Sequence, residues 1–383
     1  MEYTTIGESC SVVSGGTPSR SKTEYWRNGT IPWIKIGNIK SKYVNEYDEL
    51  ITEQGLNNSS AKLLKKGTIL YTIFATLGEA GILDTEACTN QAIAGININD
   101  PRITTDYLYY YLKSKKDYVN NIGRGVAQNN INLTTLKKFE IPLINVDKQL
   151  YIVEVLEKVE RMIGLKKKEI DDLDLLIKAR FVEMFGSVHD SVYYPYLPVG
   201  NFTKVISGGT PNRKKDEYWK RGNIPWIKTT ELQNDVIKKT EECITEVGLK
   251  ESSAKIVPIG TVLVAMYGQG KTRGKTAYLD IEACTNQACA CILPSQNVNS
   301  KYLWKYFELS YEKLRSLAQG AGQPNLNGNM IKDFPVLIPP INMQNDYVSF
   351  VEQVDKSKLA VQQSLEKTQL LFDSLMQEYF GEN

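Results

Sequence analysis

The stretch GGTPSRSKTEYWRNGTIPWIK at residues 15–35 returns as GGTPNRKKDEYWKRGNIPWIK at residues 208–228, and 15 of the 21 aligned positions are identical. The segment ACTNQA recurs in the same way at 87–92 and 283–288, and the change of offset places three extra residues between positions 263 and 282. Solenoid proteins have repeats much shorter than the interval between these copies. The pattern therefore indicates that a whole domain has been duplicated.

The composition of the 383-residue chain is that of a globular protein with room for two domains, since 42% of its residues are hydrophobic and 23% are charged. Its 46 Lys and Arg residues against 44 Asp and Glu give a net charge of +2, so the overall charge does not indicate a nucleic-acid partner. The sequence has neither an 18-residue apolar run nor a basic leader followed by apolar residues, so we expect no membrane partner. Its six cysteines lack the spacing of a disulfide framework, which favours reduced thiols and a cytoplasmic location.

Each half of the chain divides into a domain followed by a long helix. Residues 1–146 and 187–341 mix β-rich runs with turn signals, so each is expected to be a mixed α+β domain. The expected strands are IPWIKI (31–36), TILYTIF (68–74), AIAGINI (92–98), IPWIK (224–228), TVLVAMY (261–267) and ACACIL (288–293). The expected helices are YLYYYLKSKK (107–116) and YLWKYFELSYEKL (302–314).

Residues 147–186 and 342–383 are each expected to form one long helix, because apolar residues recur in them with a seven-residue period. The periodic residues are Leu156, Val159, Ile163, Ile170, Leu173, Ile177 and Met184, then Val351, Val354, Val361, Leu365, Phe372, Leu375 and Tyr379. Polar residues interrupt both apolar seams, which disfavours a long parallel homodimer. They are Lys166, Arg180, Lys358 and Thr368. We favour an antiparallel intramolecular coiled coil with pseudo-twofold symmetry, and two independent dimerisation helices are the alternative.

No catalytic constellation is visible in the sequence. His189 is the one histidine, and the other half has none at the matching place, so a linker residue is the simplest interpretation. Cys284, Cys289 and Cys291 lack the paired C-x2-4-C spacing of zinc sites, and we expect them to be buried thiols. The sequence also lacks a G-x4-G-K-[ST] motif, a strand-following G-x-G-x-x-G motif and a methyltransferase [N/D]-P-P-[Y/F] motif. We therefore expect neither a metal nor a cofactor in this chain.

The duplicated loops carry the candidate binding residues, in three groups. The first group surrounds the Gly-Gly turn, where small residues let the backbone approach a ligand and basic side chains suit phosphates. It comprises Thr17, Arg20, Lys22, Lys35, Thr210, Arg213, Lys214, Lys215 and Lys228. A plain turn with solvated lysines is the alternative, and the recurrence of Thr, Pro, Arg and Lys in both copies favours a functional role.

The second group lies in the loop ahead of ACTNQA, at 74–86 and 267–282, where the two copies share their flanks but differ in length and content. A site that binds the same kind of polymer but reads a different sequence would have this pattern. The group comprises Glu79, Tyr267, Gln269, Lys271, Arg273 and Lys275. Basic and amide side chains can reach base edges or phosphates, and a carboxylate can accept a hydrogen bond from cytosine N4.

The third group lies in RGVAQNNIN (124–132) and its counterpart QGAGQPNLN (319–327). It comprises Arg124, Gln128, Asn130, Gln323 and Asn325. Amide side chains are the bidentate partners of adenine. A helix cap would explain one asparagine in each copy, but not the recurrence of the whole set.

The ordered set of these features resembles the specificity (S) subunit of type I restriction–modification enzymes. The resemblance rests on GGTP…YW…G-x-IPWIK, TNQA, the G-x2-Q-x3-N segment before I-P-L and the Q-x7-E helix, which occur twice in the same order and cover essentially the whole chain. It implies that residues 1–146 and 187–341 are target-recognition domains, each reading one half of a split double-stranded DNA target. It also implies that 147–186 and 342–383 form an antiparallel coiled coil that docks methyltransferase subunits.

The resemblance further implies a division of labour among subunits. Two methyltransferase (M) subunits would carry S-adenosylmethionine and methylate adenine, and restriction (R) subunits would join through them, with ATP and Mg confined to these partners. The chain itself would be a non-catalytic specificity subunit. Two alternatives stay open: the specificity chain of a single-complex restriction enzyme of another type, and a non-catalytic helical-hairpin scaffold with two binding modules.

Overall fold

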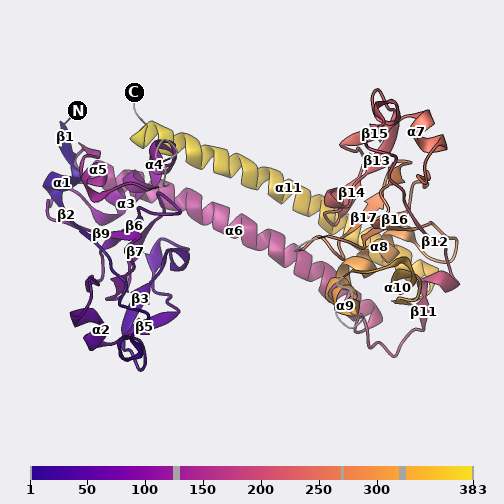
Figure 1. The fold of residues 1–383 in the computed structure, drawn as a ribbon, viewed down its shortest axis with the longest axis horizontal. Coiled ribbons are helices and arrows are strands. Elements are labelled where there is room, and N and C mark those ends of the chain that lie inside the picture. The colour runs from indigo at the N-terminus through magenta and orange to yellow at the C-terminus, as the bar shows by residue number, and fades with distance from the viewer. Residues whose placement is uncertain (1, 124–129, 269–270, 319–324, 382–383) are drawn as a thin grey trace. The chain divides into compact units, whose positions relative to one another are not determined.

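The structure is a computed structural model that describes residues 2–123, 130–268, 271–318 and 325–381. The chain forms two compact units, Met1–Lys167 with Gln363–Asn383 and Lys168–Gln362, called here the first and second units (Figure 1). Each unit contains one copy of the repeat and part of both long helices. Within the described residues, no helix is long and apolar enough to cross a membrane.

The first unit is built on three small sheets. A five-stranded sheet of order β2-β9-β6-β7-β4 comprises Cys10–Ser14, Ile93–Ile98, Ile69–Thr72, Ala80–Leu83 and Tyr43–Val44. A three-stranded sheet of order β5-β3-β8 comprises Glu49–Ile51, Ile31–Ile34 and Cys88–Thr89. The antiparallel pair β1 and β10 comprises Glu2–Thr5 and Glu140–Leu143. The short helices are α1 (Ile6–Ser9), η1 (Thr23–Tyr25), η2 (Ile36–Asn38), α2 (Glu53–Asn57), α3 (Thr105–Ser114), α4 (Lys116–Gly123) and α5 (Leu133–Lys137).

The second unit repeats this topology. Its five-stranded sheet of order β12-β19-β16-β17-β14 comprises Val205–Ser207, Cys289–Ile292, Val262–Ala265, Thr276–Leu279 and Asp235–Ile237. Its three-stranded sheet of order β15-β13-β18 comprises Glu242–Ile244, Ile224–Ile227 and Cys284–Thr285. The antiparallel pair β11 and β20 comprises Tyr196–Pro198 and Pro335–Leu337. The short helices are η3 (Val199–Asn201), η4 (Asp216–Tyr218), η5 (Thr229–Glu231), α7 (Glu246–Lys250), α8 (Ser300–Leu309), α9 (Tyr311–Leu317) and α10 (Gly328–Lys332).

The expected duplication of a mixed α+β domain is confirmed, and each expected strand run contains one observed strand. The expected helix 302–314 is wrong in one respect, because it is broken into α8 and α9 at Ser310. The buried Ser310 hydroxyl donates a hydrogen bond to the carbonyl of Tyr306, 2.7 Å away. The first unit has a corresponding break at Lys115, between α3 and α4. The cysteines expected in the core, Cys284, Cys289 and Cys291, are buried.

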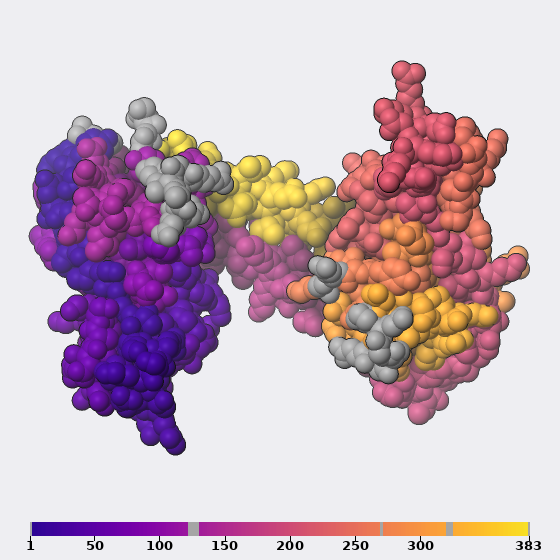
Figure 2. All heavy atoms as spheres, in the orientation of Figure 1, coloured from indigo at the N-terminus to yellow at the C-terminus, as the bar shows by residue number. Residues whose placement is uncertain are grey.

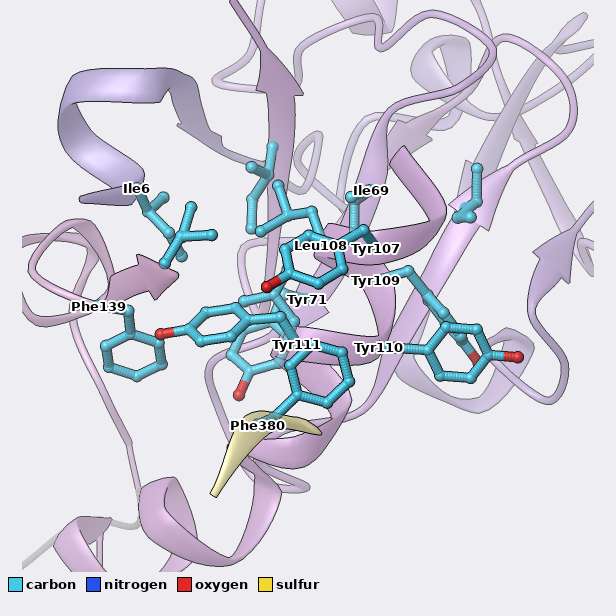
Figure 3. Close-up of a cluster of buried hydrophobic side chains, with 14 of the residues drawn as sticks. Ile6, Ile69, Tyr71, Tyr107, Leu108, Tyr109, Tyr110, Tyr111, Phe139 and Phe380 are labelled. Carbon is cyan, nitrogen blue, oxygen red and sulfur yellow. The ribbon is translucent and has the colours of Figure 1, made fainter. Parts of the chain in front are cut away.

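Each long helix contributes side chains to the cores of both units. In the first unit, the buried tyrosines Tyr107 and Tyr111 of α3 lie against Phe380, with ring centroids 5.4 and 6.3 Å apart (Figure 3). In the second unit, Tyr302 of α8 packs against Phe185, with ring centroids 5.7 Å apart. Phe380 lies far from the first domain in the sequence, whereas Phe185 directly precedes the second domain.

The two long helices, α6 (Val146–Phe185) and α11 (Ile341–Phe380), contact each other in an antiparallel sense. In the first unit, the early α6 residues Leu156 and Ile163 share a buried cluster with Phe372 and Phe380, near the end of α11. In the second unit, the late α6 residues share a cluster with the early residues of α11. The members of that cluster are Ile177, Phe181 and Phe185 with Tyr347, Val348, Val351 and Val354.

Two of the four polar residues predicted in the seam, Lys166 and Lys358, pair across the two helices. The other two bond within their own helix, Arg180 to Glu183 and Thr368 to the carbonyl of Ser364. Lys166 donates a hydrogen bond to the hydroxyl of Ser364, at 2.8 Å, in the first unit. Lys358 forms an ion pair with Asp174, at 2.5 Å, in the second unit. Each lysine meets its partner on the other helix in only one register. These pairs therefore specify the antiparallel alignment of the two helices. The intramolecular pairing predicted from the sequence is thereby confirmed.

Candidate nucleic-acid interface

The Gly-Gly turns are closed inside the domains. The amide groups of Gly15 and Gly16 donate to the carbonyls of Ile93 and Thr89, at 3.1 and 2.8 Å. A Cβ atom on Gly15 would lie 2.2 Å from the hydroxyl of Thr89, and Gly208 is equally confined. The expectation that these glycines expose N–H groups to a phosphate is therefore wrong, because the turn needs glycine to fit between two strands.

The arginine that follows each turn is held by two indole rings and a carboxylate. The guanidinium of Arg20 lies 3.6 Å from the ring centroid of Trp26 and 4.9 Å from that of Trp33, and it forms an ion pair with Glu49 at 2.5 Å. In the second unit, Arg213 has the same arrangement with Trp219, Trp226 and Glu242. Both arginines are about half exposed. Their recurrence in the two copies thus has a packing explanation.

Most lysines of the first group also have partners within their own domain. Lys22 and Lys215 donate to the hydroxyls of Tyr25 and Tyr218, at 2.9 and 2.6 Å. Lys35 bonds Glu49 at 2.7 Å, and this hydrogen bond holds the pKa of the Glu49 carboxyl below its ordinary value.

Lys228 bonds both Glu241 and Glu242, at 2.8 and 2.9 Å, and these hydrogen bonds raise the pKa of Lys228. Lys214 is exposed and, among the residues that the structure describes, has no ion pair. It is therefore the lysine of this group whose charge is most available to a ligand.

The threonine of each GGTP segment bonds the glutamine of a TNQA segment. Thr17 donates to Gln91 at 2.5 Å, and Thr210 donates to Gln287. Both glutamines are exposed. Two segments that recur together in the sequence are thus neighbours in each folded domain.

The two divergent loops are closed by the same backbone hydrogen bond, and each has a glycine with positive φ at the equivalent position. In the first domain, the amide of Thr72 donates to the carbonyl of Glu79 at 2.9 Å, and Gly78 has a φ of +82°. In the second, the amide of Ala265 donates to the carbonyl of Lys275 at 2.9 Å, and Gly274 has a φ of +86°. We call the segments between these closures loop 1 (73–79) and loop 2 (266–275). The three extra residues of the second copy lie within loop 2.

Equivalent positions in the two loops carry opposite charges. Glu79 and Lys275 occupy the same place, directly before β7 and β17. The carboxylate of Glu79 forms an ion pair with Lys116 of α4 at 2.6 Å. The ammonium group of Lys275 bonds the side-chain carbonyl of Gln233. The predicted contact of Glu79 with a cytosine would compete with this ion pair.

Loop 2 carries the other predicted residues, and its described part reaches the surface of the second unit (Figure 2). Lys271 and Tyr267 are exposed, and Arg273 is partly buried. The Nε atom of Arg273 is buried and has no hydrogen-bond partner among the described residues. A buried guanidinium nitrogen without a partner is rare. The predicted Gln269 lies outside the described residues.

The described ends of the two amide-rich segments contact these loops. Asn130 forms an isolated bridge with Phe74 of loop 1, and the amide of Leu326 donates to the carbonyl of Met266 at 3.0 Å. The side chains of Asn132 and Asn327 cap α5 and α10, as the cap alternative predicts. Asn325, next to Leu326, is exposed. Three predicted residues, Arg124, Gln128 and Gln323, lie outside the described residues.

The residues that hold the loops in place were not predicted from the sequence. Asn120 of α4 donates to the carbonyl of Leu77, at 3.3 Å, and Arg315 of α9 donates to the carbonyl of Arg273, at 3.0 Å. These positions correspond in the repeat but differ in residue type, so sequence identity between the two copies does not reveal them. In the described parts of the chain, no group of three or more His, Cys, Asp or Glu residues is placed to hold a metal ion.

A family model matches the chain twice. It is the model of the type I restriction modification DNA specificity domain, and it matches residues 1–175 and 197–370. Each matched stretch contains one copy of the repeat and most of the long helix that follows it.

Two curated proteins illustrate the similarity in sequence. The MjaIX specificity subunit of a type I restriction enzyme from Methanocaldococcus jannaschii is 25% identical over 401 residues, covering 98% of this chain and 91% of the relative. The EcoR124I/EcoR124II specificity subunit from Escherichia coli is 29% identical over 168 residues, covering 42% of this chain and 41% of the relative.

Two solved structures share the fold. The S subunit of a type I restriction–modification system from M. genitalium has a TM-score of 0.57 at 15% identity, covering 100% of this chain and 96% of that one. A chain from a structure on complex assembly and conformational transition of the type I system has a TM-score of 0.65 at 16% identity, covering 99% and 97%.

Proposed function

Because the chain belongs to the family of type I restriction–modification DNA specificity proteins, we propose that it is the DNA-reading, non-catalytic subunit of such an enzyme. Each of its two recognition domains reads one half of a bipartite target in double-stranded DNA. The divergent loops, with the amide segments beside them, supply the contacts to bases.

The observation that carries this proposal is the pair of positions 79 and 275. The two loops close on the same backbone hydrogen bonds, yet one ends in a glutamate and the other in a lysine. Two identical domains would read two identical half-sites, as symmetric dimers do. Opposite charges at equivalent positions of the same backbone fold instead favour two different half-sites, and therefore an asymmetric target.

The partners follow from the family. The paired helices α6 and α11 dock methyltransferase subunits, two per chain, which bind S-adenosylmethionine and methylate adenine, and restriction subunits join through them with ATP and Mg. A chain with the same fold belongs to a structure on complex assembly of the type I system, which favours assembly of this chain with partner subunits. The setting for an enzyme that acts on cellular DNA is the cytoplasm.

The proposal is tested by mapping methylated adenines in DNA from cells that express the chain with its methyltransferase subunits. The expected result is one gapped motif whose two half-sites differ. Exchange of residues 1–146 for the matching domain of a relative is expected to change one half-site only. Methylation at an ungapped palindrome, or a change in both half-sites after the exchange, would contradict the proposal.

A further inference from the structure

Each divergent loop rests on the helix that follows in its domain, at two positions one helical turn apart. We infer that Tyr311 and Arg315 of α9 are positioning residues that set how loop 2 reads DNA, and that Lys116 and Asn120 of α4 do the same for loop 1. The inference rests on the proposed function and adds to it that the unit of specificity is a loop together with two helix positions.

In the second unit, both helix residues bind the backbone of the loop. The hydroxyl of Tyr311 donates to the carbonyl of Lys271 at 2.8 Å, and Nη1 of Arg315 donates to the carbonyl of Arg273 at 3.0 Å. The two helix residues also contact each other, since Nη1 of Arg315 donates to the hydroxyl of Tyr311 at 3.1 Å. One guanidinium therefore holds the loop at Arg273 and also contacts the tyrosine that holds the loop at Lys271.

The end of loop 2 is pressed against the same two side chains. A Cβ atom on Gly274 would lie 3.3 Å from Cγ of Arg315 and 3.4 Å from the ring of Tyr311. The φ of +86° at this glycine is in the left-handed region that favours glycine. Loop 2 thus contacts α9 at Gly274, where the absence of a side chain lets the backbone approach the helix.

These hydrogen bonds orient side chains without restricting their identity. Carbonyl groups accept the bonds, so Lys271 and Arg273 can be replaced by other residues while the backbone stays anchored. The anchors fix the direction in which the exposed Lys271 leaves the loop. Base contacts need such fixed geometry, because a bidentate pair requires two aligned hydrogen bonds.

In the first unit, the corresponding positions use different chemistry. Asn120 corresponds to Arg315 and donates to the carbonyl of Leu77 at 3.3 Å. Lys116 corresponds to Tyr311 but binds a side chain, the carboxylate of Glu79, at 2.6 Å. A Cβ atom on Gly78 would lie 2.8 Å from Cα of Lys116, so this loop also descends onto its helix. The carboxylate of Glu79 is thus one of the groups that hold loop 1 against α4.

It follows that a loop and its helix positions are matched. Transfer of loop 1 into the second domain would place Glu79 opposite Tyr311 and so remove its ion pair with Lys116. Transfer of loop 2 into the first domain would place Lys275 near Lys116, with two like charges in contact. Each loop needs its own pair of helix residues to take up its reading conformation.

The test uses the chain in complex with its methyltransferase subunits and a library of random-sequence duplex DNA. Bound duplexes are sequenced for the wild type, Tyr311→Phe, Arg315→Ala and Asn120→Ala. Tyr311→Phe removes one hydroxyl, and Tyr193→Phe in the exposed linker is its matched control. We expect Tyr311→Phe and Arg315→Ala to weaken base preference about tenfold at one half-site, and Asn120→Ala at the other.

Further measurements separate positioning from general stability. The thermal midpoint of the Tyr311→Phe complex is expected to equal that of Tyr193→Phe, and hydrogen exchange is expected to rise within residues 271–275 alone. Arg315→Lys, which keeps one donor, is expected to restore part of the lost preference.

Unchanged base preference in Tyr311→Phe and Arg315→Ala would overturn the inference, and so would an equal loss at both half-sites. These outcomes would leave the proposed function intact, because the wild type still selects a bipartite sequence. A wild-type complex that selects no sequence would instead overturn the proposed function, and the inference with it.

Discussion

The guanidinium of Arg213 lies 3.7 Å from the ring centroid of Trp219, and the same contact recurs between the corresponding residues of the first unit. Each arginine is closed on its other side by a carboxylate, Glu242 or Glu49. The sequence that recurs most faithfully in the two halves therefore builds the interior of a small subdomain. Its conservation between copies reflects shared packing.

Substitution of Arg213 by alanine is expected to destabilise the second unit. The change removes the indole contacts, worth about 0.5–1 kcal/mol for an exposed cation–π pair, and leaves Glu242 with Lys228 as its partner. Urea unfolding followed by Trp fluorescence measures the loss. An Arg213→Ala variant with wild-type stability would show that the packing explanation is wrong.

Substitution of Lys214 by alanine is expected to weaken DNA binding without affecting stability. Lys214 is exposed and unpaired among the described residues, so its charge can displace a counterion from a phosphate. The slope of log K against log salt concentration is expected to fall by about 0.9, equally for cognate and random duplexes. Lys220, which is paired with Asp216, provides the matched control, and a similar fall for Lys220→Ala would contradict the assignment.

Substitution of Arg221 by asparagine is expected to stabilise the second unit. Arg221 has a φ of +60°, and the corresponding Asn28 of the first unit has a φ of +57°. The left-handed conformation costs an ordinary residue about 1–2 kcal/mol, and asparagine less. Denaturant titration should show a gain of up to about 1 kcal/mol for Arg221→Asn. The reverse change, Asn28→Arg, should lower the stability of the first unit, and a gain there would refute the backbone argument.

Substitution of Phe380 by alanine is expected to destabilise the first unit selectively. Phe380 is 4% exposed and packs against Tyr107 and Tyr111, so its removal leaves a cavity that costs about 3–5 kcal/mol. Hydrogen exchange should increase in α3 and remain unchanged in α8. Phe185→Ala, at the corresponding position of the second unit, should give the opposite pattern, and equal effects of both variants on both units would contradict the assignment of each helix end to one core.

The sequence was sufficient to predict the duplication, the strands around IPWIK and the antiparallel helix pair. The sequence identity between the two copies and the seven-residue period of apolar residues can both be recognised without knowledge of tertiary contacts. The predicted use of Lys166 and Lys358 as polar seam residues also needed only the period, although their partners Ser364 and Asp174 did not follow from it.

The interpretation of the Gly-Gly turn failed for a physical reason. A glycine that admits a ligand and a glycine that admits another strand have the same sequence signature, and the 2.2 Å approach to Thr89 becomes visible only in three dimensions. The brace of loop 2 was missed because Arg315 acts on a backbone carbonyl, which leaves no mark on the loop sequence.

The membership of residues 363–381 in the first unit has a consequence for synthesis on the ribosome. Phe372 and Phe380 belong to the buried cluster of the first unit, but they emerge after every residue of the second. At about 5–20 residues per second, translation of the intervening segment takes roughly 10–40 s. During that interval α3 is covered by α6 but lacks Phe380, the partner of Tyr107 and Tyr111, so the core of the nascent first domain stays incomplete and open to chaperones while the second is already complete.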